Sequence, residues 1–244
     1  MKNFKCIIAY NGTGFYGSQR QPNKRTVQGE IEKAIKQVTG ENVNLTIAGR
    51  TDSGVHAEGQ VINFKSETNL TPHALTKLLN RNLPSDVQIQ SIEEVEDNFN
   101  ARFCAKLKTY SYKFYLSNEI NPVIDNFALC VPYKIDIEKM KNACTYIQGE
   151  HDFKAFMSTG AKVKDTIRKV EKIDIFHIKN NIFELKITGN AFLYNMVRII
   201  MGVLLRVGDG TLQSDQIGQI IKDGIRPRTK TAEAKGLTLE SVEY

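Results

Sequence analysis

The sequence contains no apolar run near the roughly 18 residues that a membrane-spanning helix needs. The residues from Met1 to Lys5 lead into a strand-like segment that is too short for the apolar core of a signal peptide. Low-complexity tracts and blocks of like charge are also absent. These absences disfavour membrane, secreted and disordered classes of protein. We therefore expect a soluble protein in the cytoplasm, with no membrane partner.

Cysteine is scarce and scattered: Cys6, Cys104, Cys130 and Cys144 show no C-x-x-C spacing. Neither a disulfide framework nor a zinc site is therefore indicated, and we expect reduced thiols. The segment Asn11–Gly14 contains a G-x-G, but the helix after it is expected to start only near Thr26, and no G-x-x-x-x-G-K-[ST] loop occurs. Nucleotide-binding folds are disfavoured for this reason. Serine and cysteine nucleophile motifs are absent as well.

The chain has 244 residues, of which 41% are hydrophobic and 25% are charged. This is the composition of an ordinary globular protein. This length suits one large domain or two small ones. Lys plus Arg number 33 against 27 for Asp plus Glu, which gives a net charge of +6. The excess suits a polyanionic partner, although a lysine-rich surface can also serve solubility alone.

The spacing of apolar residues predicts two α/β halves with similar element order. The first half has strand-like stretches at 4–10, 43–47, 61–64 and 87–89, and helices beginning at Thr26 and Thr71. The second has strands at 110–114 and near 237–242, a helix at 140–147, a hairpin at 173–187, and helices at about 191–206 and 213–223. The least regular stretch lies near 94–106, so we expect domains at 1–102 and 103–244. The predicted fold is α/β (α+β), with two split β-α-β units packed edge to edge.

The most unusual segment is Gly49–Ala57, which lies between two strand-like stretches. Glycines on both sides of Asp52 allow a tight backbone path that can project this carboxylate into a cleft. An Asp-Ser-Gly turn whose carboxylate only accepts backbone N–H groups is the simpler alternative. Asp52 and His56 also suggest metal ligands, but without a third ligand nearby they make a weak site.

Arg198 lies in the apolar stretch Phe192–Leu204, so we expect its side chain to be at least partly buried. A buried guanidinium needs a carboxylate or phosphate partner, because an unpaired charge there costs several kcal/mol. Asp52 is a candidate partner across a domain cleft. Pairing with another acid and extension of the head to the surface are the alternatives.

The run Lys106–Tyr115, which contains Lys108 and Tyr110, alternates cations and aromatics. Exposed aromatics on a sheet can stack on bases while lysines hold phosphates. An aromatic core on one face with solvated lysines on the other is at least as common. Phosphate contacts form easily in loops, but a solvated basic surface explains basic residues there equally well. Six further basic residues lie in loop-like stretches: Arg20, Lys24, Arg25, Arg226, Arg228 and Lys230.

The segment Gly49–Ala57 resembles the G-R-T-D-x-G-V-H-A signature of the TruA-type tRNA pseudouridine synthases. Other blocks resemble this family in the same order along the chain: 10–15, 19–22, 26–29, 99–103, 149–153, 189–193 and 236–237. The resemblance implies two RRM-like (ferredoxin-like) domains with sheets joined into one. It further implies a basic catalytic cleft between the domains and a homodimer.

The resemblance also implies an activity: isomerisation of uridine to pseudouridine in the tRNA anticodon stem-loop, at RNA positions 38, 39 and 40. It implies that Asp52 is the nucleophile, Tyr110 the active-site tyrosine and Arg198 the partner of the catalytic carboxylate. Arg50 matches the arginine that takes the place of the flipped uridine. No cofactor or metal is expected, because the reaction involves neither redox change nor hydrolysis. The remaining expected substrate-binding residues are Arg20, Lys24, Arg25, His56 and Lys108.

Two positions depart from the family pattern: Ser18 replaces a large aromatic, and Glu233 replaces a common proline. Either change can alter RNA docking or dimer packing, so a paralogue that modifies another RNA, such as ribosomal RNA, stays open. A non-catalytic RNA-binding module is a second alternative, although pure binding needs no buried Asp–Arg pair. A metal-dependent hydrolase using Asp52 and His56 is a third, and chelators would abolish its activity.

Overall fold

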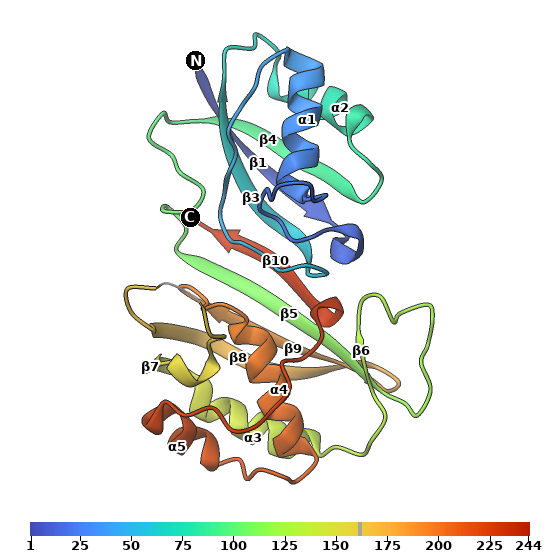
Figure 1. Ribbon diagram of the computed structural model, residues 1–244, viewed down its shortest axis with the longest axis vertical. Coiled ribbons are helices and arrows are strands. Elements are labelled where there is room, and N and C mark those ends of the chain that lie inside the picture. The colour runs from blue at the N-terminus through green and yellow to red at the C-terminus, as the bar shows by residue number, and fades with distance from the viewer. Residues whose placement is uncertain (161–162) are drawn as a thin grey trace. The chain divides into compact units, whose positions relative to one another are not determined.

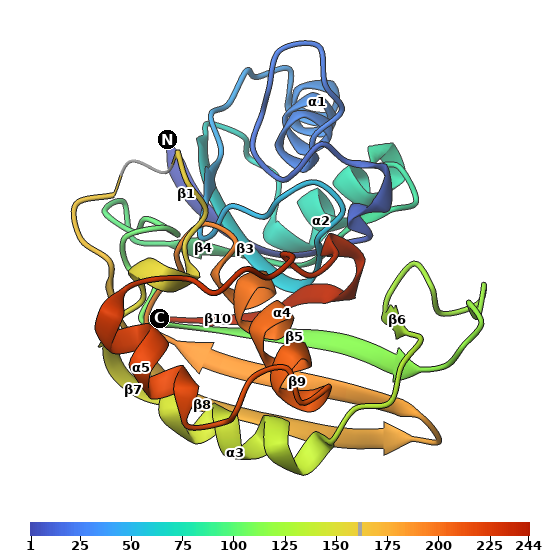
Figure 2. The ribbon, with the colours of Figure 1, turned by 60° about the horizontal axis from the view of Figure 1, so that its bottom comes forward.

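The computed structural model describes residues 1–160 and 163–244, which form two compact units. Unit 1 comprises Met1–Lys106 and Thr238–Tyr244, and unit 2 comprises Leu107–Leu237. In each unit, helices cover one face of a β-sheet (Figures 1 and 2), which confirms the expected α/β class. We expected domains at 1–102 and 103–244. The structure instead places residues 238–244, at the end of the chain, in unit 1.

Unit 1 is built on a sheet with the order β4-β1-β3-β10. Its strands are β1 (Lys2–Tyr10), β2 (Thr46–Ile47), β3 (His56–Ser66), β4 (Val87–Val95) and β10 (Leu237–Glu243), and its helices are η1 (Gly12–Gly14), α1 (Val27–Thr39) and α2 (Pro72–Asn82). β1 is antiparallel to both β3 and β4, and β2 pairs with β3. β10 runs parallel to β3, with Thr238 opposite His56 and Leu239 opposite Ala57. Through this pairing, β10 belongs to the sheet of unit 1 although it follows all of unit 2 in the sequence.

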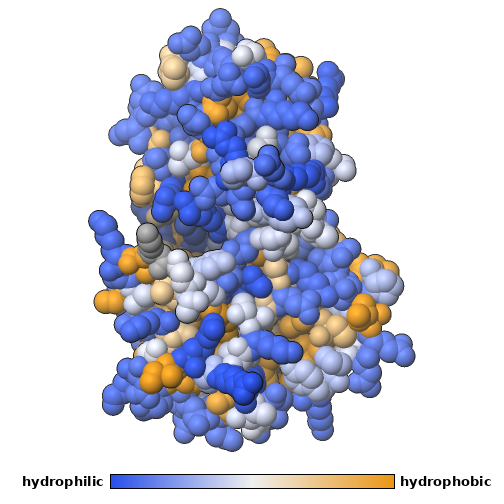
Figure 3. Space-filling view, in the orientation of Figure 1, coloured by the Kyte–Doolittle hydropathy of each residue, from blue (hydrophilic) through white to orange (hydrophobic). Residues whose placement is uncertain are grey.

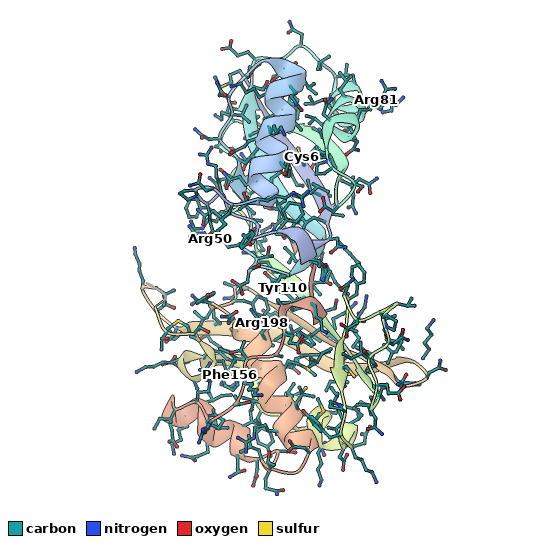
Figure 4. All side chains as sticks on the ribbon, turned by 45° about the vertical axis from the view of Figure 1, so that its right-hand side comes forward. Cys6, Arg50, Arg81, Tyr110, Phe156 and Arg198 are labelled. Carbon is teal, nitrogen blue, oxygen red and sulfur yellow. The ribbon has the colours of Figure 1, made fainter. Side chains whose placement is uncertain are left out.

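Local sequence signals set the limits of the unit 1 helices. The Thr26 side chain accepts the Gly29 N–H at the start of α1, and Gly40 ends this helix with φ 79°. The Thr71 side chain likewise accepts the Ala74 N–H before α2. Alternate side chains of β1 are buried, among them Cys6, which Figure 4 labels in the core of the unit. The strand predicted at 4–10 and the helices predicted to begin at Thr26 and Thr71 are confirmed as β1, α1 and α2.

Unit 2 has a sheet with the order β5-β9-β8-β7, and β6 pairs in parallel with β5. Its strands are β5 (Leu107–Leu116), β6 (Leu129–Val131), β7 (Gly149–Asp152), β8 (Ile167–Lys179) and β9 (Ile182–Gly189). Its helices are α3 (Ile137–Ile147), α4 (Met196–Gly208), α5 (Gln216–Asp223), η2 (Lys154–Phe156) and η3 (Ala234–Gly236). The predicted hairpin is confirmed as β8 and β9, with Asn180 at φ 50° in the turn.

Both faces of β5 carry buried side chains, since Ser111 and Tyr115 are buried on the face opposite Tyr112 and Phe114. Tyr112 and Phe114 are buried on one face, as predicted, whereas Lys113 lies on the other with its ammonium 3.8 Å from the Glu184 carboxylate. α4 is buried over most of its surface because nearly all of its residues are apolar. Among the described residues, no helix is long and apolar enough to cross a membrane. On the face drawn in Figure 3, hydrophilic side chains predominate and hydrophobic ones form only small groups.

Two predicted elements are shorter than expected. The stretch 43–47 contains a strand only at Thr46–Ile47, although Val43 and Leu45 are buried as their pattern suggests. The helix expected from about 191 begins at Met196, because Asn195 adopts the left-handed conformation at φ 61° and interrupts the helical backbone.

Candidate active site

The loop that carries Asp52 joins β2 to β3. Its first part is fixed by Gln60, whose side chain accepts the Gly49 N–H at 3.3 Å and donates to the Gly49 carbonyl at 2.7 Å. The Val55 N–H then donates to the Asp52 carbonyl at 3.2 Å, which closes a turn around Gly54 at φ 80°. Asp52 therefore stands at the start of a closed turn, and its side chain is half-buried.

Thr51, the residue before Asp52, is held by two other segments. Its N–H donates to the Ser18 hydroxyl at 2.9 Å, and its carbonyl accepts the Ser18 N–H at 3.1 Å. Its hydroxyl lies 2.8 Å from the Tyr10 hydroxyl. Tyr10 is almost fully buried, and this burial raises its pKa. The backbone entering Asp52 is thus anchored inside unit 1.

The other side of the turn packs on η1. The Gly12 N–H donates to His56 Nδ1 at 3.0 Å, and the Ser53 hydroxyl donates to the Phe15 carbonyl at 2.9 Å. A Cβ at Gly12 would lie 2.0 Å from the Val55 carbonyl oxygen, so only glycine permits this approach. His56 is 3% exposed, and its role within the structure is to connect β3 with η1.

Arg198 lies in the first turn of α4 in unit 2. Its Nε donates to the Ala232 carbonyl at 2.8 Å and its Nη1 donates to Asn195 Oδ1 at 2.9 Å. Asn195 in turn donates from Nδ2 to the Ser158 hydroxyl at 2.9 Å. The Arg198 side chain is half-buried, as the sequence predicts, and these bonds fix the direction of its guanidinium.

Tyr110 lies on β5, which belongs to the same unit as α4 (Figure 4). Its ring meets the Phe192 ring edge-on, with 5.1 Å between centroids, and it is 7% exposed. Nearby along the strand, Tyr112 donates its hydroxyl to the Glu233 carbonyl at 2.7 Å. Burial raises the pKa of Tyr112. Lys108 is half-buried on the same strand.

Three of the expected RNA-binding cations are exposed in unit 1. Arg50 lies in the Asp52 loop and is labelled in Figure 4. Arg20 makes an exposed ion pair with Glu32 at 3.0 Å. The Lys24 ammonium lies 4.3 Å from the centroid of the exposed Tyr16 ring. All three cations are therefore accessible from solvent.

Arg25 differs from these cations because it is only half-exposed and its guanidinium binds two carboxylates of the protein. Nη1 and Nη2 donate to the two Asp86 oxygens at 2.7 and 2.8 Å, and Nε donates to Glu30 at 3.0 Å. The guanidinium carbon also lies 4.2 Å from the Phe15 ring centroid. Hydrogen bonds from Arg25 lower the pKa of Asp86, and Asp86 raises the pKa of Arg25. Carboxylates thus engage three of the five N–H groups of Arg25, which limits what it can offer a phosphate.

The residues that hold these side chains were not indicated by the sequence. Gln60 and Tyr10 contact segments distant along the chain, and no spacing pattern predicts such contacts. Asn195 lies three residues before Arg198, and this spacing was the one signal that could have indicated it. In the described part of the chain, no group of three or more His, Cys, Asp or Glu side chains is placed to hold a metal ion.

A model of the family described as tRNA pseudouridine synthase matches residues 6–104 and 143–244. The chain belongs to this family. Asp52 and Arg198 lie inside the matched segments, whereas Tyr110 lies between them. The resemblance inferred from the sequence is thereby confirmed.

Relatives in this synthase family match along the whole chain. Proteins named tRNA pseudouridine synthase A from Acetivibrio thermocellus and Listeria monocytogenes serotype 4b are each 43% identical, over 100% of both chains. The protein of that name from Geobacillus sp. is 42% identical over 100% of this chain and 98% of the relative. Among solved structures, an archaeal box H/ACA sRNP Nop10–Cbf5 complex matches 83% of this chain and 43% of its own chain, at 13% identity. Its TM-score of 0.38 is too low to bear on the fold.

Proposed function

We propose that this synthase isomerises uridine to pseudouridine in the anticodon stem-loop of tRNA, at positions 38, 39 and 40. The observation that carries the proposal is the Asp52 loop, which is hydrogen-bonded on both sides of the carboxylate in a chain of this family. A reactive carboxylate benefits from such a rigid support, because misplacement by about 1 Å can cost a hundredfold in rate.

The chemistry requires the uridine to leave its stack, detach from ribose, rotate and re-bond through carbon 5. Asp52 acts either as the nucleophile that displaces uracil from the anomeric carbon or as the base that takes a ribose proton while uracil leaves and a glycal forms. Arg198 pairs with this carboxylate and keeps it ionised. Tyr110 stacks beneath the uracil and assists removal of the carbon 5 proton.

The RNA contacts in this proposal come mainly from exposed or half-buried cations. Arg50 takes the place of the flipped uridine, while Arg20, Lys24 and Lys108 bind phosphates. Arg25 and His56 serve the substrate indirectly, by stabilising the segments that carry these residues. A homodimer in the cytoplasm is part of the proposal. It is supported by the family resemblance, and the cytoplasm also by four free cysteines.

Incubation with unmodified tRNA, followed by mapping of pseudouridine by position, tests the proposal. We expect modification at positions 38, 39 and 40 by the wild-type protein. Asp52→Asn should abolish it and leave tRNA affinity within about tenfold, or roughly 1.4 kcal/mol, because phosphate contacts carry the affinity. Modification of ribosomal RNA alone would favour a paralogue. Binding of tRNA without any product would favour a non-catalytic module.

A further inference from the structure

Ser18 lies in the segment between η1 and α1 that also carries Arg20 and Lys24. It replaces the large aromatic that is usual in the family, yet its side chain is 1% exposed. The side chain therefore does not face a surface that RNA or a second subunit can reach. Its hydroxyl accepts the N–H of Thr51, the residue before the proposed nucleophile.

The contact between Ser18 and Thr51 is reciprocal and tightly packed. Ser18 also donates its own N–H to the Thr51 carbonyl, so two bonds join the two residues. A Cβ at Gly17, which has φ 87°, would lie 2.9 Å from the Thr51 carbonyl oxygen. The two backbones thus approach so closely that Thr51 cannot move toward residues 17–18.

We propose that Ser18 is a positioning residue for Asp52. Ser18 couples the Arg20–Lys24 segment to the backbone of the proposed nucleophile. The inference rests on the proposed function. Without the Ser18 hydroxyl, the buried Thr51 N–H loses its acceptor, and the Arg50–Thr51 peptide to which it belongs can rotate to find another one. A small rotation there displaces the nearby Asp52 carboxylate from its reactive position and leaves the proposed phosphate contacts of Arg20 and Lys24 unchanged.

Ser18→Ala tests the inference, with Asn80→Ala as the matched control. Asn80 Oδ1 accepts the N–H of the buried Ile89 at 2.8 Å, so each variant deprives one buried N–H in unit 1 of its side-chain acceptor. Asn80→Ala also removes the bond from Asn80 Nδ2 to the Ile89 carbonyl, which makes it the more disruptive of the two for folding. With tRNA saturating and well below the melting temperature, we expect Ser18→Ala to reduce the single-turnover rate about tenfold, equivalent to about 1.4 kcal/mol. The dissociation constant for tRNA should change less than about twofold. Asn80→Ala should lower the melting temperature and keep the wild-type rate.

The outcomes separate a positioning role from other roles. A wild-type rate for Ser18→Ala, or an equal loss of rate in Asn80→Ala, would overturn the inference. A loss that appears only in the dissociation constant would make Ser18 an RNA-docking residue and would overturn it as well. If the wild-type protein forms no pseudouridine, the proposed function fails and this inference fails with it. An active wild type with an unaffected Ser18→Ala contradicts the inference alone.

Discussion

The Arg25–Asp86 pair provides a test of whether a cation predicted to bind RNA instead stabilises the protein. The perturbations are Arg25→Met, Asp86→Asn and the double variant, which together form a double-mutant cycle. Exposed ion pairs contribute about 0.2–1 kcal/mol, and hydrogen bonds to charged groups about 1.5–3 kcal/mol. The pair is bidentate, but its side chains are 36% and 27% exposed, so solvent screens part of the interaction. We expect a coupling free energy of about 1.5 kcal/mol.

The assay is thermal unfolding of the four proteins at several pH values. For a chain of this length, a loss of about 1.5 kcal/mol lowers the melting temperature by roughly 3–6 °C. Because Arg25 lowers the Asp86 pKa from its ordinary value of 3.8, the pair contributes its full stability above that value. The contribution is lost as the pH falls through the lowered pKa. The difference in melting temperature between wild type and Asp86→Asn should therefore be constant at neutral pH and should close in strong acid.

A parallel measurement of tRNA affinity against salt concentration uses Lys24→Met as the control. Removal of a phosphate-binding cation reduces the slope of log affinity against log salt by about one, and we expect this for Lys24→Met but not for Arg25→Met. The reasoning would be refuted if Arg25→Met melted like the wild type and reduced the salt slope. Arg25 would then be an RNA ligand whose ion pairs contribute nothing to folding.

Two further predictions concern catalysis and RNA binding. Arg198→Met should fold but react at least about a hundredfold more slowly in single turnover, a loss of roughly 2.7 kcal/mol, with Arg198→Lys intermediate because it keeps the charge without the planar head. A methionine variant that melts normally and reacts at the wild-type rate would make Arg198 purely structural. Wild-type affinity for tRNA should fall steeply between low and physiological salt, given the net charge of +6, and a flat dependence measured by filter binding would contradict this.

Features that depend on neighbouring residues were predictable from the sequence. The limits of α1 follow from Thr26 and Gly40, which act through hydrogen bonds and dihedral angles within one helical turn. The buried face of β5 follows from alternation of Tyr112 and Phe114. The half-buried Arg198 was also expected, because it lies in a mostly apolar stretch.

Features that depend on contacts between distant residues were not predictable. Arg25 and Asp86 are far apart along the chain, and nothing local to Arg25 distinguishes it from the exposed Lys24. The bond from Thr51 to Ser18 likewise joins two loops whose approach is set by the fold. The hydrophobic pattern of a single sequence indicates the structure of each segment, but it does not indicate which segments contact one another.

The pairing of β10 with β3 has a consequence for the order in which a ribosome makes the protein. The strand lies after all of unit 2 in the sequence, yet it pairs with His56 and Ala57, where the Asp52 loop ends. A Cβ at Gly59 would lie 2.1 Å from the Glu240 carbonyl oxygen, so β10 packs closely along this part of β3. While residues 107–237 are being synthesised, this stretch of β3 has no β10 beside it, and its backbone is open to incorrect pairing. The nascent chain therefore pairs β10 with the strand that follows the Asp52 loop only after unit 2 has emerged.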